Sequence, residues 1–291
     1  MVIGRKAAKY VLVGAASILF VWAWQSKFAN DNDIVVYFGR PKLIASYIFS
    51  SGHELLMPAV WCFLVALGCL LLAATIVVAL IVLGLSSNRR LAAIEHLGAV
   101  AQTIPVLVIV TLFLIGEREI AKLLGIQPSA DWFCVLPVTV GLMFPPLVNG
   151  TSAILHMPLQ VKALLRMWNA PKKWRTWKVY IPYAIPQILS GVRASATWAV
   201  GATLIAEGML NGVSKSNNTL GYFLIRPYSS NNVRTTAVII ISSFLGYAVY
   251  WISGAIERYI QKRLLGQIDI DESGYPLQSS PSVEQENAYA S

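Results

Sequence analysis

Residues 55–85 are 31 consecutive residues without a charged side chain. A helix that spans a lipid bilayer needs about 20 mostly apolar residues. At a rise of about 1.5 Å per residue, this run is longer than the hydrocarbon core of a bilayer, so it must tilt or extend beyond the membrane. The whole chain agrees, because 56% of its 291 residues are hydrophobic and only 13% are charged, whereas about a quarter of the residues in a soluble domain are charged. The chain is therefore predicted to be an integral membrane protein.

Six apolar segments are long enough to be transmembrane helices, and none alternates with the period of two that a membrane-spanning strand requires. The predicted fold class is an all-α membrane protein with six transmembrane helices. The predicted helices are residues 7–24, a span within 55–85, and residues 96–116, 132–155, 188–209 and 237–256. The first begins with basic residues but ends in Trp22 and Trp24 without a cleavage site of small residues. We therefore expect an uncleaved anchor whose tryptophans lie at the membrane interface.

The lysines and arginines favour one orientation of these helices, because cytoplasmic loops are enriched in them. With the N-terminus in the cytoplasm, the inner segments hold 14 of these residues and the outer segments hold eight. Both termini are therefore expected in the cytoplasm. The net charge of +9 then lies mostly on the inner face, next to acidic lipids, and no nucleic-acid partner is needed to explain it. Residues 1–266 are expected to form the membrane domain, and the polar, acidic residues 267–291 a disordered cytoplasmic tail.

Few side chains in the predicted spans are suited to metal binding or catalysis. The cysteines Cys62, Cys69 and Cys134 lie in apolar runs and are expected to be buried thiols. The three histidines are scattered along the chain, so neither a metal site nor a cofactor is expected. An intramembrane enzyme would need a nucleophile with a base, or two acids at the same depth, and the predicted spans offer only Glu207. The chain is therefore not expected to be an enzyme.

Glu207 and Arg193 are the two charged residues singled out within the predicted spans. A carboxylate inside a membrane is costly and is a functional candidate by default, so Glu207 is a candidate for the transport pathway or for a gate. The alternative is a structural role, in which Glu207 forms a hydrogen bond with residues 211–218. Arg193 is expected to be a snorkelling or interface residue. Three prolines mark irregular points in the third and fourth predicted spans: Pro105, Pro145 and Pro146.

A basic, aromatic loop joins the fourth and fifth predicted spans, where residues 163–182 read ALLRMWNAPKKWRTWKVYIP. Apolar residues at positions 161, 164, 165 and 168 share one face of a helix, which Asn169 interrupts. A second apolar face follows with Trp174, Trp177 and Ile181, and Pro182 and Pro186 are expected to close that helix. The loop is thus predicted to form two short amphipathic helices with a bend at Asn169. It could anchor in lipid headgroups or fit a groove of a cytoplasmic partner.

Residues 181–212, IPYAIPQILSGVRASATWAVGATLIAEGMLNG, resemble the permease subunits of bacterial ABC importers, and the nearest branch is the nitrate/sulfonate/taurine type. The family's loop carries Glu-Ala-Ala, three residues, a Gly and then Leu/Ile-Pro, followed by Pro-x-x-x-x-Gly-x-Arg at the start of the next span. Pro182 matches the first proline, and Pro186, Gly191 and Arg193 match the second motif. The similarity covers about residues 40–263.

The loop motif keeps the family's spacing but not its residues. Counted back from Pro182, the position of the family's Glu is occupied by Ala163, and the Gly position by Asn169. Leu164 and Leu165 replace the two alanines. Asn suits a bend, because it tolerates the left-handed conformation best after Gly. The resemblance implies that the loss of the Glu removes a charge that, in the family, helps to hold the helix in the groove of the ATPase.

The resemblance implies a transmembrane permease subunit of an ATP-driven importer in the bacterial cytoplasmic (inner) membrane. Its ATPase-coupling loop would contain these residues: Ala163, Leu164, Leu165, Trp168, Asn169, Trp174, Trp177 and Pro182. The chain has no Walker loop for nucleotide, so two cytoplasmic ATP-binding subunits would hydrolyse ATP. A second permease subunit, identical or paralogous, and an extracytoplasmic substrate-binding protein are the other implied partners, besides membrane lipids.

The branch implies a small anion such as nitrate, a sulfonate, taurine or bicarbonate as the substrate. A permease for methionine, a metal or an amine, and a channel or membrane scaffold outside the ABC class, remain alternatives.

Overall fold

The computed structural model describes residues 41–124, 130–210, 219–225 and 232–265, together with residues 19, 22 and 23. Every regular element in these ranges is a helix, which confirms the predicted all-α class for the described part of the chain. The predicted first span, residues 7–24, lies outside the described residues apart from Leu19, Trp22 and Ala23. The predicted tail, residues 267–291, also lies outside them.

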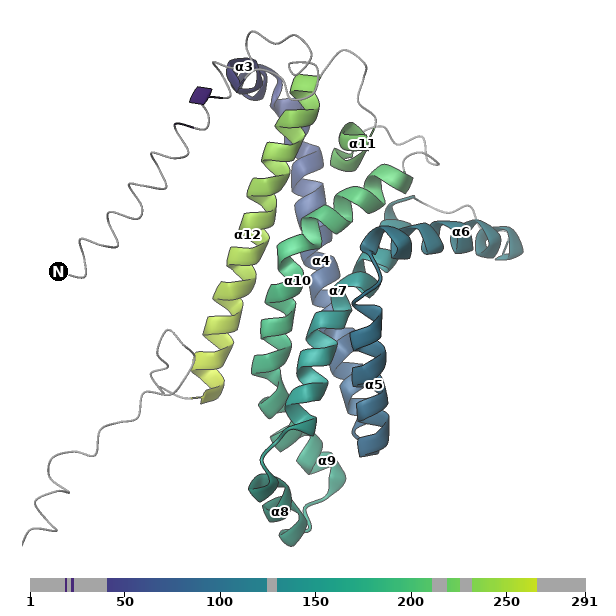
Figure 1. Cartoon of the computed structure of the whole chain (residues 1–291), viewed down its shortest axis with the longest axis vertical. Coiled ribbons are helices and arrows are strands. Elements are labelled where there is room, and N and C mark those ends of the chain that lie inside the picture. The colour runs from purple at the N-terminus through teal and green to yellow at the C-terminus, as the bar shows by residue number, and fades with distance from the viewer. Residues whose placement is uncertain are drawn as a thin grey trace, which may run out of the picture.

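The helices form an elongated bundle with short helices at both ends (Figure 1). The elements in chain order are α3 (Pro41–Ser51), α4 (His53–Gly84), α5 (Asn88–Ala101), α6 (Val106–Leu124), α7 (Ala130–Leu155), α8 (Leu159–Met167), α9 (Lys172–Arg175), the π-helix η1 (Thr176–Tyr180), α10 (Ile181–Leu210), α11 (Leu220–Ile225) and α12 (Asn232–Leu265). In Figure 1, α4, α7, α10 and α12 run along the bundle, α3 and α11 lie at one end, and α8 and α9 lie at the other end.

Four described helices are long and apolar enough to cross a membrane: His53–Gly84, Cys134–Leu155, Lys172–Met209 and Val233–Arg263. They correspond to the second, fourth, fifth and sixth predicted spans. A fifth span is present if the pair Asn88–Ala101 and Val106–Phe113 is counted as one broken span.

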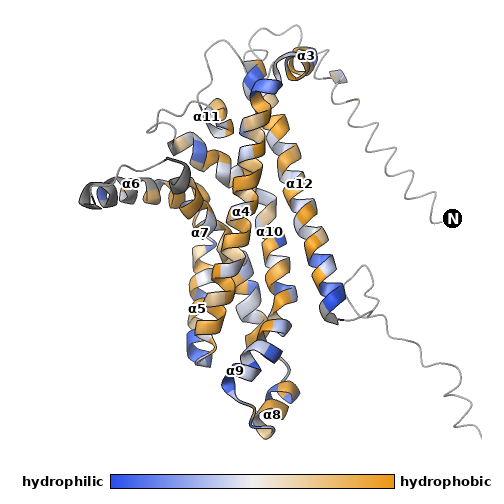
Figure 2. Cartoon of the chain, turned by 180° about the vertical axis from the view of Figure 1, so that it is seen from behind, coloured by the Kyte–Doolittle hydropathy of each residue, from blue (hydrophilic) through white to orange (hydrophobic). Residues whose placement is uncertain are grey.

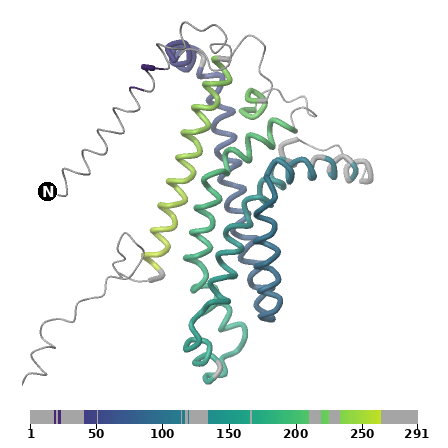
Figure 3. The backbone as a smooth tube through the Cα atoms, viewed as in Figure 1, coloured from purple at the N-terminus to yellow at the C-terminus, as the bar shows by residue number. Residues whose placement is uncertain are grey.

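The predicted third span, residues 96–116, is broken near Pro105, where the sequence predicts an irregular point, and α5 and α6 meet there at an angle of 98°. The break lies just before Pro105, whose ring removes a backbone donor and disfavours a helical conformation in the preceding residue. α6 therefore projects sideways from the bundle in the backbone trace (Figure 3).

One stripe of α4 faces the bundle and the rest of its surface is apolar and exposed. Cys62, Ala66, Cys69 and Ala73 are all buried and recur at the spacing of a single helix face. The large apolar residues between them, such as Leu64, are exposed. The orange of hydrophobic residues therefore also covers the outside of the bundle in Figure 2. An apolar exterior is what a lipid-facing helix requires. The prediction that the cysteines are buried free thiols is confirmed for all three.

α7 and α10 pack closely where they cross. Gly191 of α10 lies directly against the backbone of Pro146 in α7, where an added Cβ atom would lie 2.6 Å from the Pro146 nitrogen. α7 continues through Pro145 and Pro146 without a break. Pro146 has no N–H to offer the carbonyl of Leu142, four residues earlier. The Ser195 hydroxyl donates a hydrogen bond of 2.8 Å to that carbonyl and so replaces the missing helical bond.

Candidate functional site

The bend in the basic loop lies at Asn169, between α8 and α9. Asn169 has a φ of 41° and is the one non-glycine residue with positive φ in the described part of the chain. This confirms the predicted left-handed bend, since Asn adopts the conformation more readily than other non-glycine residues. The rings of Trp168 and Trp174, on either side of the bend, lie edge to face with centroids 5.0 Å apart. Such aromatic pairs stabilise a contact beyond the area they bury, so they fix the geometry of the bend.

Five apolar side chains of this loop are exposed at the end of the bundle: Leu164, Met167, Trp168, Trp174 and Trp177. We call these five residues the tryptophan patch. Trp168 is 65% exposed and Met167 is 84% exposed, which is unusual for large apolar residues. Of the other predicted loop residues, Ala163 is exposed, Leu165 is buried and Pro182 is half-buried. Leu165 therefore packs towards the protein, while the patch faces outwards.

The second helix of the loop is not a separate short helix, and the prediction that Pro182 and Pro186 close it is wrong. Residues Lys172–Met209 form one continuous helical stretch. Just before Pro182 the chain makes the π-helical turn η1, in which the Ile181 N–H is bonded to the carbonyl of Thr176. A wider turn accommodates a proline, which lacks an N–H and crowds the carbonyl four residues before it. Trp174 is therefore connected to α10 through an uninterrupted helix.

Arg193 joins α10 to α12. Its Nη2 donates a hydrogen bond of 2.7 Å to the hydroxyl of Tyr250, and its Nη1 lies 3.4 Å from Oε2 of Glu257. Gly254 leaves room for the guanidinium, since an added Cβ atom there would lie 3.2 Å from Nε of Arg193.

Glu257 is buried within the candidate span Val233–Arg263, so the prediction that Glu207 is the one carboxylate inside a span is wrong. The predicted span ended at residue 256, whereas α12 continues to Leu265. The spacing of Tyr250, Gly254 and Glu257 on one helix face was the signal that could have identified this site.

Glu207 is buried near the end of α10 and holds the short helix α11. Its Oε2 accepts a hydrogen bond of 3.1 Å from the N–H of Gly221. Gly221 packs so closely on α10 that an added Cβ atom would lie 2.6 Å from the nitrogen of Gly208. The hydroxyl of Thr219 accepts a further bond of 3.3 Å from the N–H of Tyr222. The partner predicted for Glu207 within residues 211–218 lies outside the described residues, and the partner observed is three residues beyond that segment.

Replacing Glu207 with alanine is expected to loosen α11. The buried N–H of Gly221 would lose its acceptor, which costs about 1–3 kcal/mol for a buried polar group. Hydrogen exchange followed by mass spectrometry should become faster in peptides covering residues 219–225 and stay unchanged in α4. Glu207→Gln keeps a carbonyl oxygen for the same bond and should exchange close to the native rate. Unchanged protection in Glu207→Ala would show that other contacts hold α11.

A polar groove lies between α7 and α10, in the half of the bundle nearest the loop. It has a volume of about 560 Å³. Its polar side chains come from both helices: Asn149, Ser152, His156, Tyr183 and Gln187. None of its lining residues is acidic. Sequence reasoning missed this site, although polar residues three and seven positions apart late in α7 are the signal that indicates one polar helix face.

A second groove, of about 340 Å³, lies between α10 and α12 and is lined by small residues as well as apolar ones. Thr197 and Gly201 lie on α10, and Ser243 and Gly246 lie on α12. Space around both glycines is open to a distance of at least 4 Å. Small residues of this kind let a neighbouring transmembrane helix approach closely. Among the residues described, no cluster of His, Cys, Asp and Glu side chains could hold a metal ion.

Comparison with known proteins matches the membrane bundle to one family. The model of the family described as "Binding-protein-dependent transport system inner membrane component" matches residues 92–262. The protein MJ0413 of Methanocaldococcus jannaschii, whose name assigns it to the ABC transporter permeases, is 28% identical over 136 residues, or 44% of this chain and 49% of the relative. The bicarbonate transport system permease protein CmpB of Synechocystis sp. is 26% identical over 139 residues, or 47% of this chain and 45% of the relative. The chain thus spans about half the length of these curated relatives.

Proposed function

The chain belongs to the family of inner membrane components of binding-protein-dependent transport systems, and from this membership we propose that it is the permease subunit of an ATP-driven importer for a small anion. It is a multi-pass membrane protein and an ABC transporter permease component. In our proposal, two cytoplasmic ATP-binding subunits power the cycle, a substrate-binding protein delivers the solute from outside, and the membrane is the bacterial inner membrane.

The tryptophan patch is the observation that carries this proposal. Trp168 and Trp174 are exposed at the end of the bundle, and a continuous helix connects Trp174 to α10. Buried aromatic anchors provide much of the binding energy at protein interfaces. We infer that a groove of each ATP-binding subunit receives this patch. Closure of the two ATP-binding subunits would then move α10 as a rigid body. This movement would switch the central pathway between inward and outward access.

The polar groove between α7 and α10 supports a translocation pathway at this position. Polar side chains in membrane-spanning helices are costly unless they face protein or a water-filled cavity. Asn149, Gln187 and Tyr183 offer hydrogen-bond donors, and no lining residue is acidic. Such a lining suits a small anion, and the bicarbonate permease CmpB among the relatives points to the same substrate class. We propose that Glu207 acts at the outer end of this pathway by holding α11 in place.

One copy of the chain is not expected to enclose a pathway, and the groove of small residues supports a second permease subunit. Apolar surface alone does not drive helices together in lipid, so membrane interfaces rely on close packing of small residues. Gly201 and Gly246 would allow a helix of the second subunit to approach α10 and α12. The second subunit can be identical or paralogous.

The decisive experiment is ATP-driven uptake by a reconstituted complex. The chain is assembled with its candidate ATP-binding subunits in vesicles that contain ATP, and the binding protein with labelled bicarbonate or nitrate is added outside. We expect accumulation only when all components and hydrolysable ATP are present. Equal uptake by the chain alone, with or without ATP, would identify a channel and contradict the proposal.

Orientation is tested with a cysteine in the basic loop. The excess of basic residues predicts that Lys173 lies in the cytoplasm. Lys173→Cys in intact cells should resist a thiol reagent that cannot cross the membrane and should react after the cells are opened. Labelling from the outside would show that the orientation is the reverse of the predicted one. The tryptophan patch would then face away from the cytoplasm, where the ATP-binding subunits are expected.

A further inference from the structure

A basic pocket lies beside the tryptophan patch, between the turn that joins α4 to α5 and the start of the long helical stretch that leads into α10. It has a volume of about 460 Å³. Four of the residues that line it are cationic and none is acidic: Lys162, Lys172, Lys173 and Arg175. Like charges that line one space repel each other, so the pocket is suited to an anion that would relieve the repulsion.

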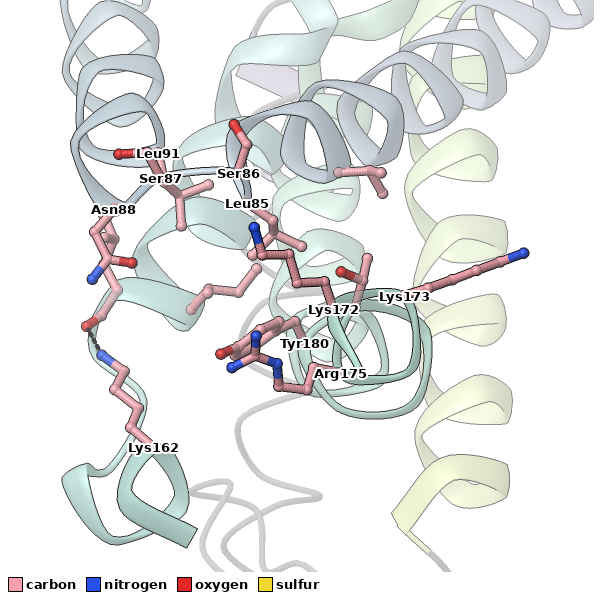
Figure 4. A pocket seen from close by; sticks show the side chains of 14 residues that line it. Leu85, Ser86, Ser87, Asn88, Leu91, Lys162, Lys172, Lys173, Arg175 and Tyr180 are labelled. Atoms are coloured by element: carbon pink, nitrogen blue, oxygen red, sulfur yellow. Dashed lines mark hydrogen bonds between the residues drawn. The ribbon is translucent and has the colours of Figure 1, made fainter. Parts of the chain in front are cut away.

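The cations do not all play the same part. Lys172 and Arg175 point into the space between Tyr180 and the α4–α5 turn, whereas the ammonium group of Lys173 points away from it (Figure 4). Lys162 donates a hydrogen bond of 2.7 Å to the carbonyl of Leu155 at the end of α7. Lys172 and Arg175 are therefore the two cations best placed to bind a ligand.

Arg175 also has a donor that is not satisfied within the protein. Its Nε atom is buried and makes no hydrogen bond in the structure. A guanidinium presents a planar fork of N–H donors that matches the oxygens of a phosphate group in a bidentate arrangement. A buried donor without an acceptor is unfavourable, so a rotation of the guanidinium that brings Nε against a phosphate oxygen would be favoured.

The first turn of α5 provides further donors. Ser87 occupies the N-cap position, but its side chain makes no capping hydrogen bond. Ser87, Asn88 and Leu91 all line the pocket, so the free N–H groups and the positive end of this 14-residue helix lie at its edge. The N-terminus of a helix is a favourable position for a phosphate.

The remaining wall is apolar. Val82, Leu85, Ile154 and Leu155 line the pocket on the side of the bundle, where α4 and α7, both long enough to cross a membrane, end. A pocket with cations on one side and an apolar wall on the other matches a phospholipid better than a soluble ion. Basic pockets between transmembrane helices on the cytoplasmic side are a known type of lipid headgroup site.

We propose that this pocket binds the phosphate of an anionic phospholipid, with Arg175 and Lys172 as its ligands and the apolar wall against the start of the acyl chains. The bound lipid would tie the α4–α5 turn to the helical segment that carries Trp174. The lipid composition of the inner leaflet would then influence how firmly the coupling segment is held. This proposal concerns the isolated chain and does not depend on transport.

The test measures lipid retention by the purified full-length chain with native mass spectrometry and lipid-dependent melting. Dihexanoyl phosphatidylglycerol is compared with dihexanoyl phosphatidylcholine, which has the same acyl chains, and inorganic phosphate is titrated separately. We expect selective retention of phosphatidylglycerol. Arg175→Gln or Lys172→Gln should each weaken it about fivefold, the effect expected for one basic residue next to an anionic headgroup. Lys262→Gln removes the same charge from the exposed end of α12 and should leave retention within about twofold of the native value.

Several other outcomes would contradict the proposal that the pocket binds an anionic phospholipid. Equal retention of phosphatidylglycerol by all variants, or equal retention of the two lipids by the native chain, would overturn the proposal. Stabilisation by phosphate as strong as that by phosphatidylglycerol would assign the site to a free anion instead. Variants that retain the lipid but lose the ATP-binding subunits would assign the pocket to an acidic protein segment. Arg175→Lys keeps the charge but lacks the bidentate fork, so its affinity for phosphatidylglycerol should lie between those of the native chain and Arg175→Gln. If Arg175→Gln fails to fold, the affinity of Arg175→Lys tests the proposal in its place.

Discussion

Gly191→Ala is expected to destabilise the bundle by about 3 kcal/mol or more, the upper part of the range for overpacking a well-packed interior. The new Cβ atom would lie 2.6 Å from the nitrogen of Pro146 and 2.8 Å from the carbonyl carbon of Pro145. These are backbone atoms, so no side-chain rotation can make room. α7 and α10 would have to separate, and the hydrogen bond from Ser195 to Leu142 would be strained with them. Thermal unfolding in detergent should show a large decrease in the melting temperature.

Gly68→Ala is the matched control. Gly68 also lies within a membrane-length helix, α4, but nothing approaches the position of its missing Cβ atom within 4 Å. Alanine is better than glycine inside a helix by about 1 kcal/mol, so this variant should be as stable as the native protein or slightly more stable. If the two variants melt at the same temperature, the α7–α10 crossing is more pliable than the contact at Gly191 implies. Gly191, the glycine of the family's Pro-x-x-x-x-Gly-x-Arg motif, would then need an explanation other than packing.

The elements that sequence analysis predicted well are those specified by adjacent residues. The uncharged run over residues 55–85 became α4 at His53–Gly84, because apolarity over that length leaves few alternatives in a membrane. The bend at Asn169 was predicted from one residue's tolerance of positive φ, and the structure has φ at 41° there. Both are local properties of the chain, and no distant partner is needed to produce them.

The features that sequence analysis mispredicted depend either on two local preferences that oppose each other or on contacts between residues far apart in the sequence. Hydropathy predicted one span over residues 96–116 with an irregular point at Pro105, whereas the backbone bends there by 98° and the two halves are separate helices. At Pro182 the opposite occurred, because the turn η1 lets the helix pass the proline. The pair of Arg193 and Glu257 spans 64 positions. The spacing of Tyr250, Gly254 and Glu257 marks one face of α12, but it does not identify Arg193 as the residue that this face contacts. The polar groove likewise forms only when α7 and α10 pack together.

Trp168→Ala and Trp174→Ala are each expected to weaken association with the ATP-binding subunits by about 2 kcal/mol, roughly a factor of 30, the scale of an aromatic anchor at an interface. Each truncation removes one ring of the edge-to-face pair at 5.0 Å and with it the shape of the patch. The measurement is co-purification of the ATP-binding subunits, combined with ATP-driven uptake. Trp251 is 59% exposed on α12, outside the patch, so Trp251→Ala should retain both activities.

The bend at Asn169 provides a test that leaves the aromatic surface intact. Asn169→Gly should be mild, because glycine adopts a φ of 41° without strain. Asn169→Val should be severe, because a β-branched residue resists positive φ and the left-handed conformation costs a non-glycine residue about 1–2 kcal/mol. A Val at this position would displace Trp168 from Trp174 even though both rings remain. The two variants therefore separate the geometry of the patch from its chemical composition.

The two sets of variants together distinguish a coupling element from a membrane anchor. A headgroup anchor needs the exposed tryptophans but not their mutual geometry, so Asn169→Val would then behave like the native protein and only the Trp variants would show a loss. A docking element needs both, because a partner's groove fits one arrangement of the rings. If all three variants lose the ATP-binding subunits while the binding protein still docks, the patch transmits ATP-driven closure to α10. Full co-purification and uptake in Trp168→Ala and Trp174→Ala would show that the tryptophans contact lipid, and the coupling site would have to lie elsewhere on the inner face.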